Sequence, residues 1–210
     1  MKKIVKASFL ATFGVLAFLP AARATATFTL NVDSCSGTCG TPPFATVTLD
    51  QTTATLVTVT ETLAANERFA GTGAGSSLEF DVSSAVGAIT VGSITSGFSN
   101  NGPDSASAFG SFPDSVTCND PASCHGGQAG NTAGPLSFTV TSTTGVTIAD
   151  FIANTSGYYF ASDIVGNNGK TGNVGDSDPG VIGVIPEPAS LSLVGACLIG
   201  LGILRRRFSV

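Results

Sequence analysis

The residue best suited to acid–base chemistry is His125, the only histidine of the 210-residue chain. Ser-His-Asp and Cys-His mechanisms place a histidine beside the nucleophile, so either mechanism would have to use His125. This residue directly follows Cys124 and precedes Gly126 and Gly127. A position between a cysteine loop and two glycines predicts an exposed imidazole rather than one held in catalytic geometry. We therefore expect no catalytic residue and no enzymatic activity.

Carboxyl groups are the next candidates for chemistry, because glycoside hydrolysis uses two of them on either side of one bond. Four of them are candidates for such a pair, and their spacing selects no two. Acidic residues on strands usually lie on solvated faces, and we expect that here. The four are Glu61, Glu67, Glu79 and Asp81.

Oxygen ligands for Ca²⁺ are concentrated near the end of the domain, where Asp176 and Asp178 follow Asn167, Asn168 and Asn173. Their order differs from an EF-hand loop, because the closing glutamate is missing. A polar turn is the simpler interpretation. We predict no metal site, and Asp176 and Asp178 remain weak candidates for one.

Sugar and phosphate sites have little support in the composition. The chain has no tryptophan, and Tyr158 and Tyr159 are its only tyrosines, so the usual stacking surfaces for a sugar ring are scarce. The glycine-rich segment 71–75 lacks the lysine of a phosphate-binding loop and is expected to be a turn. We predict no cofactor.

The cysteines form two close pairs, Cys35 with Cys39 and Cys118 with Cys124, while Cys197 stands alone in the apolar tail. Four cysteines in an exported chain predict two disulfides, and proximity favours pairing within each close pair. A zinc site that adds His125 is the competing interpretation. The spacings C-x3-C and C-x5-C-H do not match the usual zinc motifs.

Charge is distributed unevenly along the chain. Residues 27–185 contain 13 acidic residues but only Arg68 and Lys170 as bases, which gives a net charge of −11. Such a surface repels phosphate backbones, so we expect no nucleic-acid partner.

Alternation of apolar and polar residues in residues 27–165 predicts an antiparallel β-sandwich, jelly-roll or immunoglobulin-like, of about seven strands. Residues 147–153 alone suggest a short helical turn, and the Gly/Asn/Asp-rich residues 167–180 predict a long loop. The expected strands lie near residues 27–32, 46–49, 55–63, 77–82, 88–95, 137–141 and 158–164.

The first 26 residues have the pattern of a secretory signal peptide. Lys2, Lys3 and Lys6 precede an apolar run, and small residues at Ala24 and Ala26 would fit signal peptidase. Cleavage before Thr27 is expected, with a second possible site after Ala24. The Sec translocon is the implied partner.

The last 25 residues combine three features. Pro186-Glu187-Pro188 is held extended by its two prolines. The apolar run 189–204 follows, whose 16 residues would span about 24 Å as a helix, slightly short of a hydrocarbon core of about 30 Å. Arg205, Arg206 and Arg207 then predict a cytoplasmic end. We expect a transmembrane helix here, and an ordinary membrane anchor or a buried core helix is the alternative.

This combination resembles the PEP-CTERM sorting domain of exported bacterial proteins. The resemblance covers only the last 25 residues and implies an exosortase-type membrane protease as partner. It also implies export through the inner membrane of a Gram-negative bacterium to the cell surface or extracellular matrix. Such systems are linked to exopolysaccharide and biofilm production, so exopolysaccharide is a further expected partner.

The sequence thus predicts four segments: a signal peptide (1–26), a β-sandwich (27–165), a flexible stalk (166–185) and a sorting signal (186–210). A structural or adhesive role is expected for the β domain. The rival hypothesis is a secreted module that binds calcium or a glycan, or acts as a hydrolase. Neither a ligand nor the oligomeric state follows from the sequence.

Overall fold

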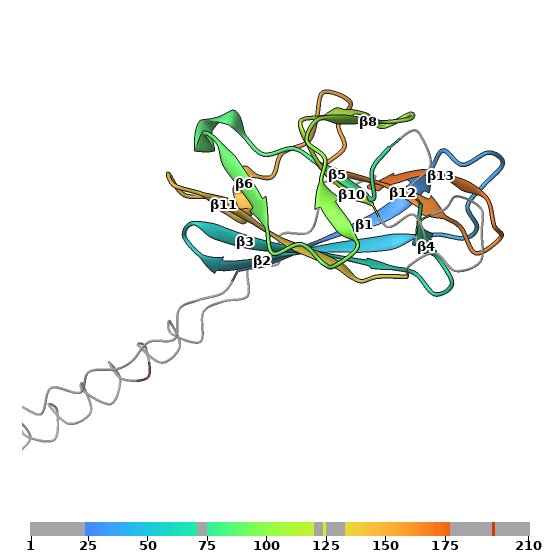
Figure 1. Cartoon of the computed structure of the whole chain (residues 1–210), viewed down its shortest axis with the longest axis horizontal. Helices are drawn as coiled ribbons and strands as arrows, with labels where there is room; N and C mark the ends of the chain where they lie inside the picture. The colour runs from blue at the N-terminus through green and yellow to red at the C-terminus, as the bar shows by residue number, and fades with distance from the viewer. Residues whose placement is uncertain (1–23, 71–74, 120–123, 125–132, 177–194, 196–210) are drawn as a thin grey trace, which may run out of the picture. The chain divides into compact units, whose positions relative to one another are not determined.

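The computed structural model describes residues 24–70, 75–119, 124, 133–176 and 195. All of these except residue 195 belong to one compact unit, Arg23–Ile185, built mostly of short strands (Figure 1). The elements are β1 (Thr25–Asp33), β2 (Ala45–Thr53), β3 (Leu56–Leu63), β4 (Arg68–Phe69), β5 (Leu78–Phe80), β6 (Ile89–Gly92), β7 (Phe98–Asn100), β8 (Asp104–Ala106), β9 (Gly110–Phe112), β10 (Asp114–Cys118), β11 (Leu136–Ser142), β12 (Phe160–Val165), β13 (Thr171–Asp176) and the 3-10 turns η1 (Ser84–Val86) and η2 (Ile148–Asp150).

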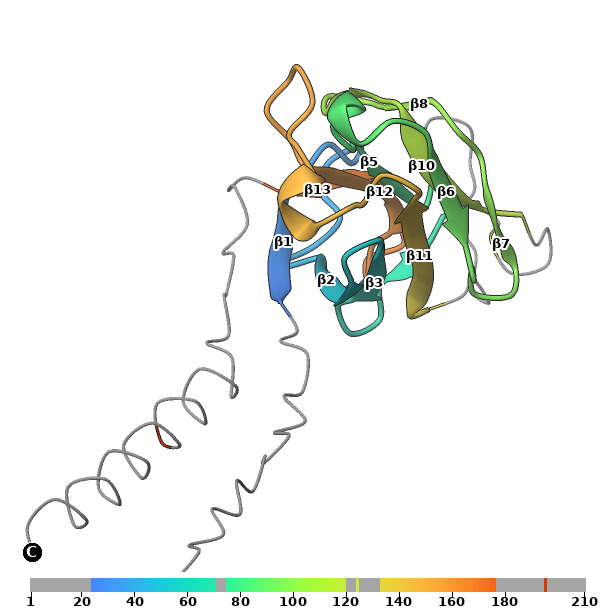
Figure 2. The ribbon, with the colours of Figure 1, turned by 90° about the vertical axis from the view of Figure 1, so that its left-hand side faces the viewer.

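Eleven strands form one antiparallel sheet in the order β6-β11-β3-β2-β1-β13-β12-β5-β10-β7, with β4 paired to β12. The edge strands β6 and β7 are consecutive in the chain and are joined by residues 93–97 alone. The sheet therefore curls around its interior and is nearly closed (Figure 2). The predicted all-β antiparallel fold class is confirmed.

The core fills the interior of this curled sheet, and it follows the alternation seen in the sequence. Inward-facing residues of β1, β2, β3 and β11 are at most 3 % exposed: Phe28, Leu30, Val47, Leu49, Val57, Val59, Phe138 and Val140. Aromatic rings meet across the interior, with Phe80 of β5 and Phe138 of β11 stacked at 5.4 Å between centroids. Each buried phenylalanine contributes roughly 1.5–3 kcal/mol to stability.

A second, smaller layer lies outside the sheet. Strands β8 and β9 pair only with each other, and this β8–β9 hairpin packs Ala106, Phe109 and Phe112 against Ala161 of β12 (Figure 1). Phe109 also lies directly over Gly175 of β13, where a side chain would overlap its ring. The hairpin thus covers the outer face of the β12–β13 pair.

One boundary predicted from the sequence is wrong. Residues 171–176, expected in a loop and stalk, form β13, which pairs with both β1 and β12 in the middle of the sheet. The segment Thr-Gly-Asn-Val-Gly-Asp does not show the usual strand alternation of β-branched and polar residues. Two of its positions are glycines, because neighbouring groups lie too close there for a side chain. A side chain at Gly172 would come within 2.7 Å of the Cys35 Cα atom. The β domain therefore extends to Asp176 rather than residue 165.

The two predicted targeting segments lie mostly outside the described residues. Residues 1–23 and the sorting signal, except Gly195, are not described. Among the residues that are described, no helix is long and apolar enough to cross a membrane.

Candidate functional site

Buried carboxyl groups are the most unusual chemical feature of the domain. Glu61, Glu67 and Glu79, expected on solvated faces, are at most 1 % exposed, and Asp163 and Asp176 are also buried. The solvated-face prediction is thus wrong for all three glutamates. An ionised carboxylate is costly to bury, so each must be neutral or held by hydrogen bonds.

Glu79 lies at the centre of a polar cluster beneath the β8–β9 hairpin. Its neighbours Leu78 and Phe80 face the core, so the Glu79 side chain points to the outer face of β5. The Glu79 Oε1 atom accepts a hydrogen bond of 2.9 Å from the Ser76 amide. The backbone of Ala106 on β8 also acts on this carboxyl group and lowers its pKa. The Glu79 carboxyl group therefore lies between β5 and the β8–β9 hairpin.

Side chains extend this cluster toward the turn between β7 and β8. The Ser76 hydroxyl donates to Asp104 Oδ2 at 2.5 Å, and Asn101 Nδ2 lies 3.2 Å from the same oxygen. The Ser115 hydroxyl donates to the Gly102 carbonyl oxygen at 2.7 Å. Asp104 Oδ1 accepts from the Ser105 amide at 2.8 Å. Both oxygens of Asp104 are thus occupied by donors, which is the arrangement of a structural hydrogen-bond network.

The electrostatics of the cluster raise the pKa of Glu79 to about 7. Burial is the main cause, and the negative charges of Asp104 and Asp163 add to it, while the Ser76 amide acts in the opposite direction. Glu79 therefore titrates in the neutral range. Its proton state changes the charge under the hairpin in the neutral range.

Glu61 occupies the opposite, inner face of the sheet. Burial raises its pKa well above 4.5, and the Ser162 hydroxyl of β12 is the polar group acting against this rise. Among the residues that the structure describes, neither Glu61 oxygen has a hydrogen-bond partner of ordinary geometry. The Ser162 hydroxyl already donates its only hydrogen to the Ser77 carbonyl oxygen at 2.6 Å. A bond between Glu61 and Ser162 therefore requires a protonated Glu61 as the donor.

Two of the four carboxylates considered for glycoside hydrolysis, Glu61 and Glu79, lie on opposite faces of the sheet. Glu61 faces the interior of the sheet and Glu79 faces its outer side, so the sheet separates them. Burial raises the pKa of Glu67, and the backbone of Asn167 partly offsets the rise. Half-buried Asp81 lies near Asp114 and raises the pKa of that residue further. Glu61 and Glu79 therefore do not flank one bond.

The calcium candidates are likewise placed in structural roles. Asp176 is buried, and its Oδ1 atom accepts hydrogen bonds of 3.0 Å from the amides of Tyr159 and Phe160, which holds the start of β12. Asp178 lies outside the described residues. Within the described part of the chain, no group of three or more His, Cys, Asp or Glu side chains could hold a metal ion.

The tyrosines pack into the domain rather than forming an open platform. Tyr158 meets Phe109 edge to face with centroids 4.9 Å apart, and Tyr159 lies 5.3 Å from Phe28. Both are half-buried. A stacking surface for a sugar ring thus receives no support from these two residues.

Both disulfides pair as predicted, Cys35 with Cys39 and Cys118 with Cys124. The zinc alternative is therefore wrong, because disulfide sulfur is not a thiolate ligand. His125, which that alternative required, lies outside the described residues.

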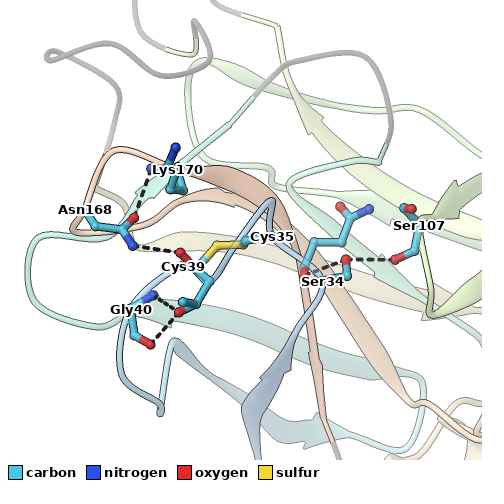
Figure 3. The surroundings of a disulfide bond; sticks show 9 residues. Ser34, Cys35, Cys39, Gly40, Ser107, Asn168 and Lys170 are labelled. Atoms are coloured by element: carbon cyan, nitrogen blue, oxygen red, sulfur yellow. Dashed lines mark hydrogen bonds between the residues drawn. A yellow bond between two sulfur atoms is a disulfide. The ribbon is translucent and has the colours of Figure 1, made fainter.

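The Cys35–Cys39 loop is packed onto the turn between β12 and β13 (Figure 3). Asn168 Nδ2 donates to the Thr38 carbonyl oxygen at 2.7 Å. On the other side, the Ser34 hydroxyl lies 3.1 Å from the carbonyl oxygens of both Ser107 and Asn173. A side chain at Gly166 would overlap the Cys39 carbonyl group. This loop therefore links the β12–β13 turn to the β8–β9 hairpin.

The comparisons with known proteins found no relative. No family model, curated protein or solved structure matches the chain.

Sequence reasoning could have found part of this site. Glu61 continues the inward series of Val57 and Val59 at a spacing of two, so the pattern itself placed it inside. The solvent-exposed position was expected only because a carboxylate usually avoids the core. No local signal marked Ser76, Asn101 and Asp104, because they meet only after the β8–β9 hairpin folds over β5.

Proposed function

We propose that the chain is an exported surface or extracellular-matrix protein, processed by an exosortase-type membrane protease, with a structural or adhesive role. The observation that supports this proposal best is the way the chain enters and leaves the β domain. The first strand, β1, and the last, β13, are antiparallel neighbours, with Leu30 opposite Asp176 (Figure 2). The chain therefore enters and leaves on the same side of the domain. This arrangement is compatible with a precursor that has membrane-directed segments at both ends.

The two disulfides support the same proposal. Disulfides are typical of oxidising compartments, and both are compatible with an exported or extracellular protein. The sorting motif Pro186-Glu187-Pro188, the membrane helix at 189–204 and the basic cluster Arg205-Arg206-Arg207 complete the proposal at the sequence level. The Sec translocon, the membrane and exopolysaccharide are the proposed partners besides the protease.

The role of the β domain is proposed to be structural, and its sandwich type stays a prediction of a jelly-roll or immunoglobulin-like form. Its polar side chains hydrogen-bond within the domain. Asp104, Asp176 and Asn168 each bond to main-chain or side-chain groups elsewhere in the domain. The rival role, a calcium- or glycan-binding module, predicts that Ca²⁺ raises the unfolding temperature of the full-length protein. Equal unfolding temperatures with Ca²⁺ and with a chelator would argue against the calcium form of the rival.

The decisive experiment for sorting is the intact mass of the protein from the cell surface and medium, in the native host and in a host lacking exosortase. A product ending near Pro186-Glu187-Pro188 only in the native host would support the proposal. Full-length protein in both hosts would make the tail a plain anchor.

A matched pair of variants sharpens this experiment. Glu187→Ala should impair processing, whereas Asp178→Ala removes an acidic residue eight positions upstream of the motif's first proline and should not. Both variants should retain the oxidised β domain, which electrophoresis without reductant checks. Normal processing of Glu187→Ala would overturn the motif assignment.

A further inference from the structure

The chain contains the tripeptide Asn-Asn-Gly twice, at residues 100–102 and 167–169. An asparagine followed by glycine is the pair most open to main-chain attack on the side-chain amide, because glycine leaves the following nitrogen unshielded. The reacting asparagine and glycine are the same at both sites, although Pro103 follows the first copy and Lys170 the second. A large difference in rate between the two sites should therefore come from the fold. The structure places them in very different surroundings.

The second copy is held on three sides. Asn168 Nδ2 donates to the Thr38 carbonyl oxygen at 2.7 Å, and its Oδ1 atom accepts from the Lys170 amide at 3.0 Å. The nitrogen of Gly169, which would be the attacking atom, donates to the Gly166 carbonyl oxygen at 2.8 Å. Reaction at Asn168 must first break these bonds.

In the first copy, the attacking atom, the Gly102 nitrogen, is not held by a hydrogen bond within the described residues. Asn101 is exposed and lies in the turn between β7 and β8, where Gly102 has φ of +76° and open space where a side chain would stand. Within the described residues, the Gly102 amide nitrogen has no hydrogen-bond partner. The Asn101 side chain is held only by longer contacts, 3.3 Å to the Ser76 hydroxyl and 3.2 Å to Asp104.

We propose that Asn101 is a site of spontaneous conversion to aspartate and isoaspartate, and that this modification loosens the β8–β9 hairpin from the sheet. The Gly102 nitrogen attacks the Asn101 Cγ atom and forms a new C–N bond. The bond from Cγ to Nδ2 breaks, and ammonia leaves with the proton that the Gly102 nitrogen gives up. Water then opens the cyclic imide at either carbonyl, which leaves a carboxyl group where the amide stood.

The consequence for the hairpin follows from the contacts of Asn101. Its amide donates toward Asp104 Oδ2 and the Ser76 hydroxyl, and Ser76 in turn holds Glu79 through its backbone amide. A carboxylate at position 101 has no hydrogen to donate and adds a negative charge beside Asp104. Glu79 and Asp163 are the other charges acting within this cluster. Repulsion then replaces an attractive contact at the base of β8.

Peptide mapping by mass spectrometry tests the modification. Full-length protein is held in mildly alkaline buffer, and conversion at the two sites is followed over time. Asn101 should convert at least about fivefold faster than Asn168, the factor that one hydrogen bond of about 1 kcal/mol supplies. In urea, where the fold no longer distinguishes the two sites, their rates should approach each other. Equal rates in the folded protein, or faster conversion at Asn168, would overturn the assignment.

A second measurement tests the effect on the hairpin. Asn101→Asp, which copies the aspartate product, should raise amide hydrogen exchange in β8 and β9 relative to β2 and β3. Asn168→Asp is the matched control and should leave exchange in the hairpin unchanged. Unaltered exchange of β8 and β9 in Asn101→Asp would show that the modification has no such consequence.

Discussion

The carboxyl group of Glu61 on β3 faces the hydroxyl of Ser162 on β12 across the interior of the sheet. The serine hydrogen is already given to Ser77, so the glutamate can bond to it only as a neutral acid. A fully buried carboxyl group, whose pKa burial raises well above 4.5, thus lies among the apolar side chains of the core. Such a group weakens a core that apolar residues could fill.

Replacing Glu61 with leucine should therefore stabilise the domain. The change removes two buried oxygens that lack ordinary partners and keeps a similar volume. We expect a gain of about 1–3 kcal/mol, seen as a rise of roughly 2–4 °C in unfolding temperature for each kcal/mol. Glu61→Gln is the matched control, since it keeps a buried polar group and should give no comparable gain. A leucine variant less stable than wild type would contradict this account.

Glu79 should make stability depend on pH in the neutral range. Its pKa is raised from 4.5 to about 7, so the folded domain binds this proton more tightly than the unfolded chain does. The stabilisation is complete below about pH 4.5 and is lost as the pH rises through 7, about 2 kcal/mol in all after allowance for solvent screening. Glu79→Gln, which cannot lose a proton, should be more stable than wild type at pH 8 and similar to it at pH 5.

Urea unfolding at both pH values measures this difference. Asp33→Asn, at a half-exposed position on β1, is the control for removing one negative charge. If Glu79→Gln and Asp33→Asn changed the pH dependence equally, the effect would belong to net charge and not to the cluster beneath the hairpin.

The sequence predicted the strands in which apolar and polar residues alternate. It did not predict burial where a second layer of the structure covers the polar face of a strand. Residues 28–32, 45–49, 57–63 and 136–140 alternate because one side of each strand meets the core and the other meets water. Glu79 also sits between two core residues, yet the β8–β9 hairpin hides it from solvent. That cover depends on contacts far apart in the chain, so no pattern within β5 could indicate it.

β13 was missed for a related reason. Its two glycines are selected by close neighbours, Cys35 beside Gly172 and Phe109 over Gly175, and not by intrinsic strand preference. A segment rich in Gly, Asn and Asp is typical of a loop, and only the partners on both sides make it a strand. The disulfide pairing, by contrast, was predictable because sequence proximity decided it.

For the proposed export signal, the fold is more compatible with cleavage after Ala24 than with cleavage before Thr27. Ala26 is 1 % exposed and pairs with Leu49, and the Thr25 hydroxyl donates to Asp50 at 2.6 Å. Cleavage before Thr27 would remove both residues from β1, whereas cleavage after Ala24 leaves the strand whole. We predict a mature protein that begins at Thr25, which N-terminal peptide mass spectrometry can establish.

A variant at the recognition position separates the two sites. Ala22→Leu places a large residue three positions before the cut after Ala24 and should shift cleavage to the bond after Ala26. The product should be less stable than the normal one. A wild-type product that begins at Thr27 would refute the prediction.

Gly166 should tolerate no side chain, because the Cys39 main chain occupies the space that a Cβ atom needs. Gly166→Ala is expected to destabilise the domain by more than about 1–3 kcal/mol, the usual cost of overpacking, since the obstacle is backbone that cannot rotate away. Gly169→Ala lies in the same turn with nothing within 4 Å of the added atom, and it should cost only the strain of its positive φ. Thermal unfolding of the two variants compares them directly.

The position of β13 has a consequence for the order of events during biosynthesis. The last strand to emerge is inserted between the first strand and β12, so the centre of the sheet stays open until residue 176 is present. Pairing of residues this distant in the chain is slow and cannot begin early. If the chain crosses a membrane from its N-terminus onward, the domain therefore stays unfolded until nearly all of it has passed. The complete sheet forms only after residue 176 has crossed.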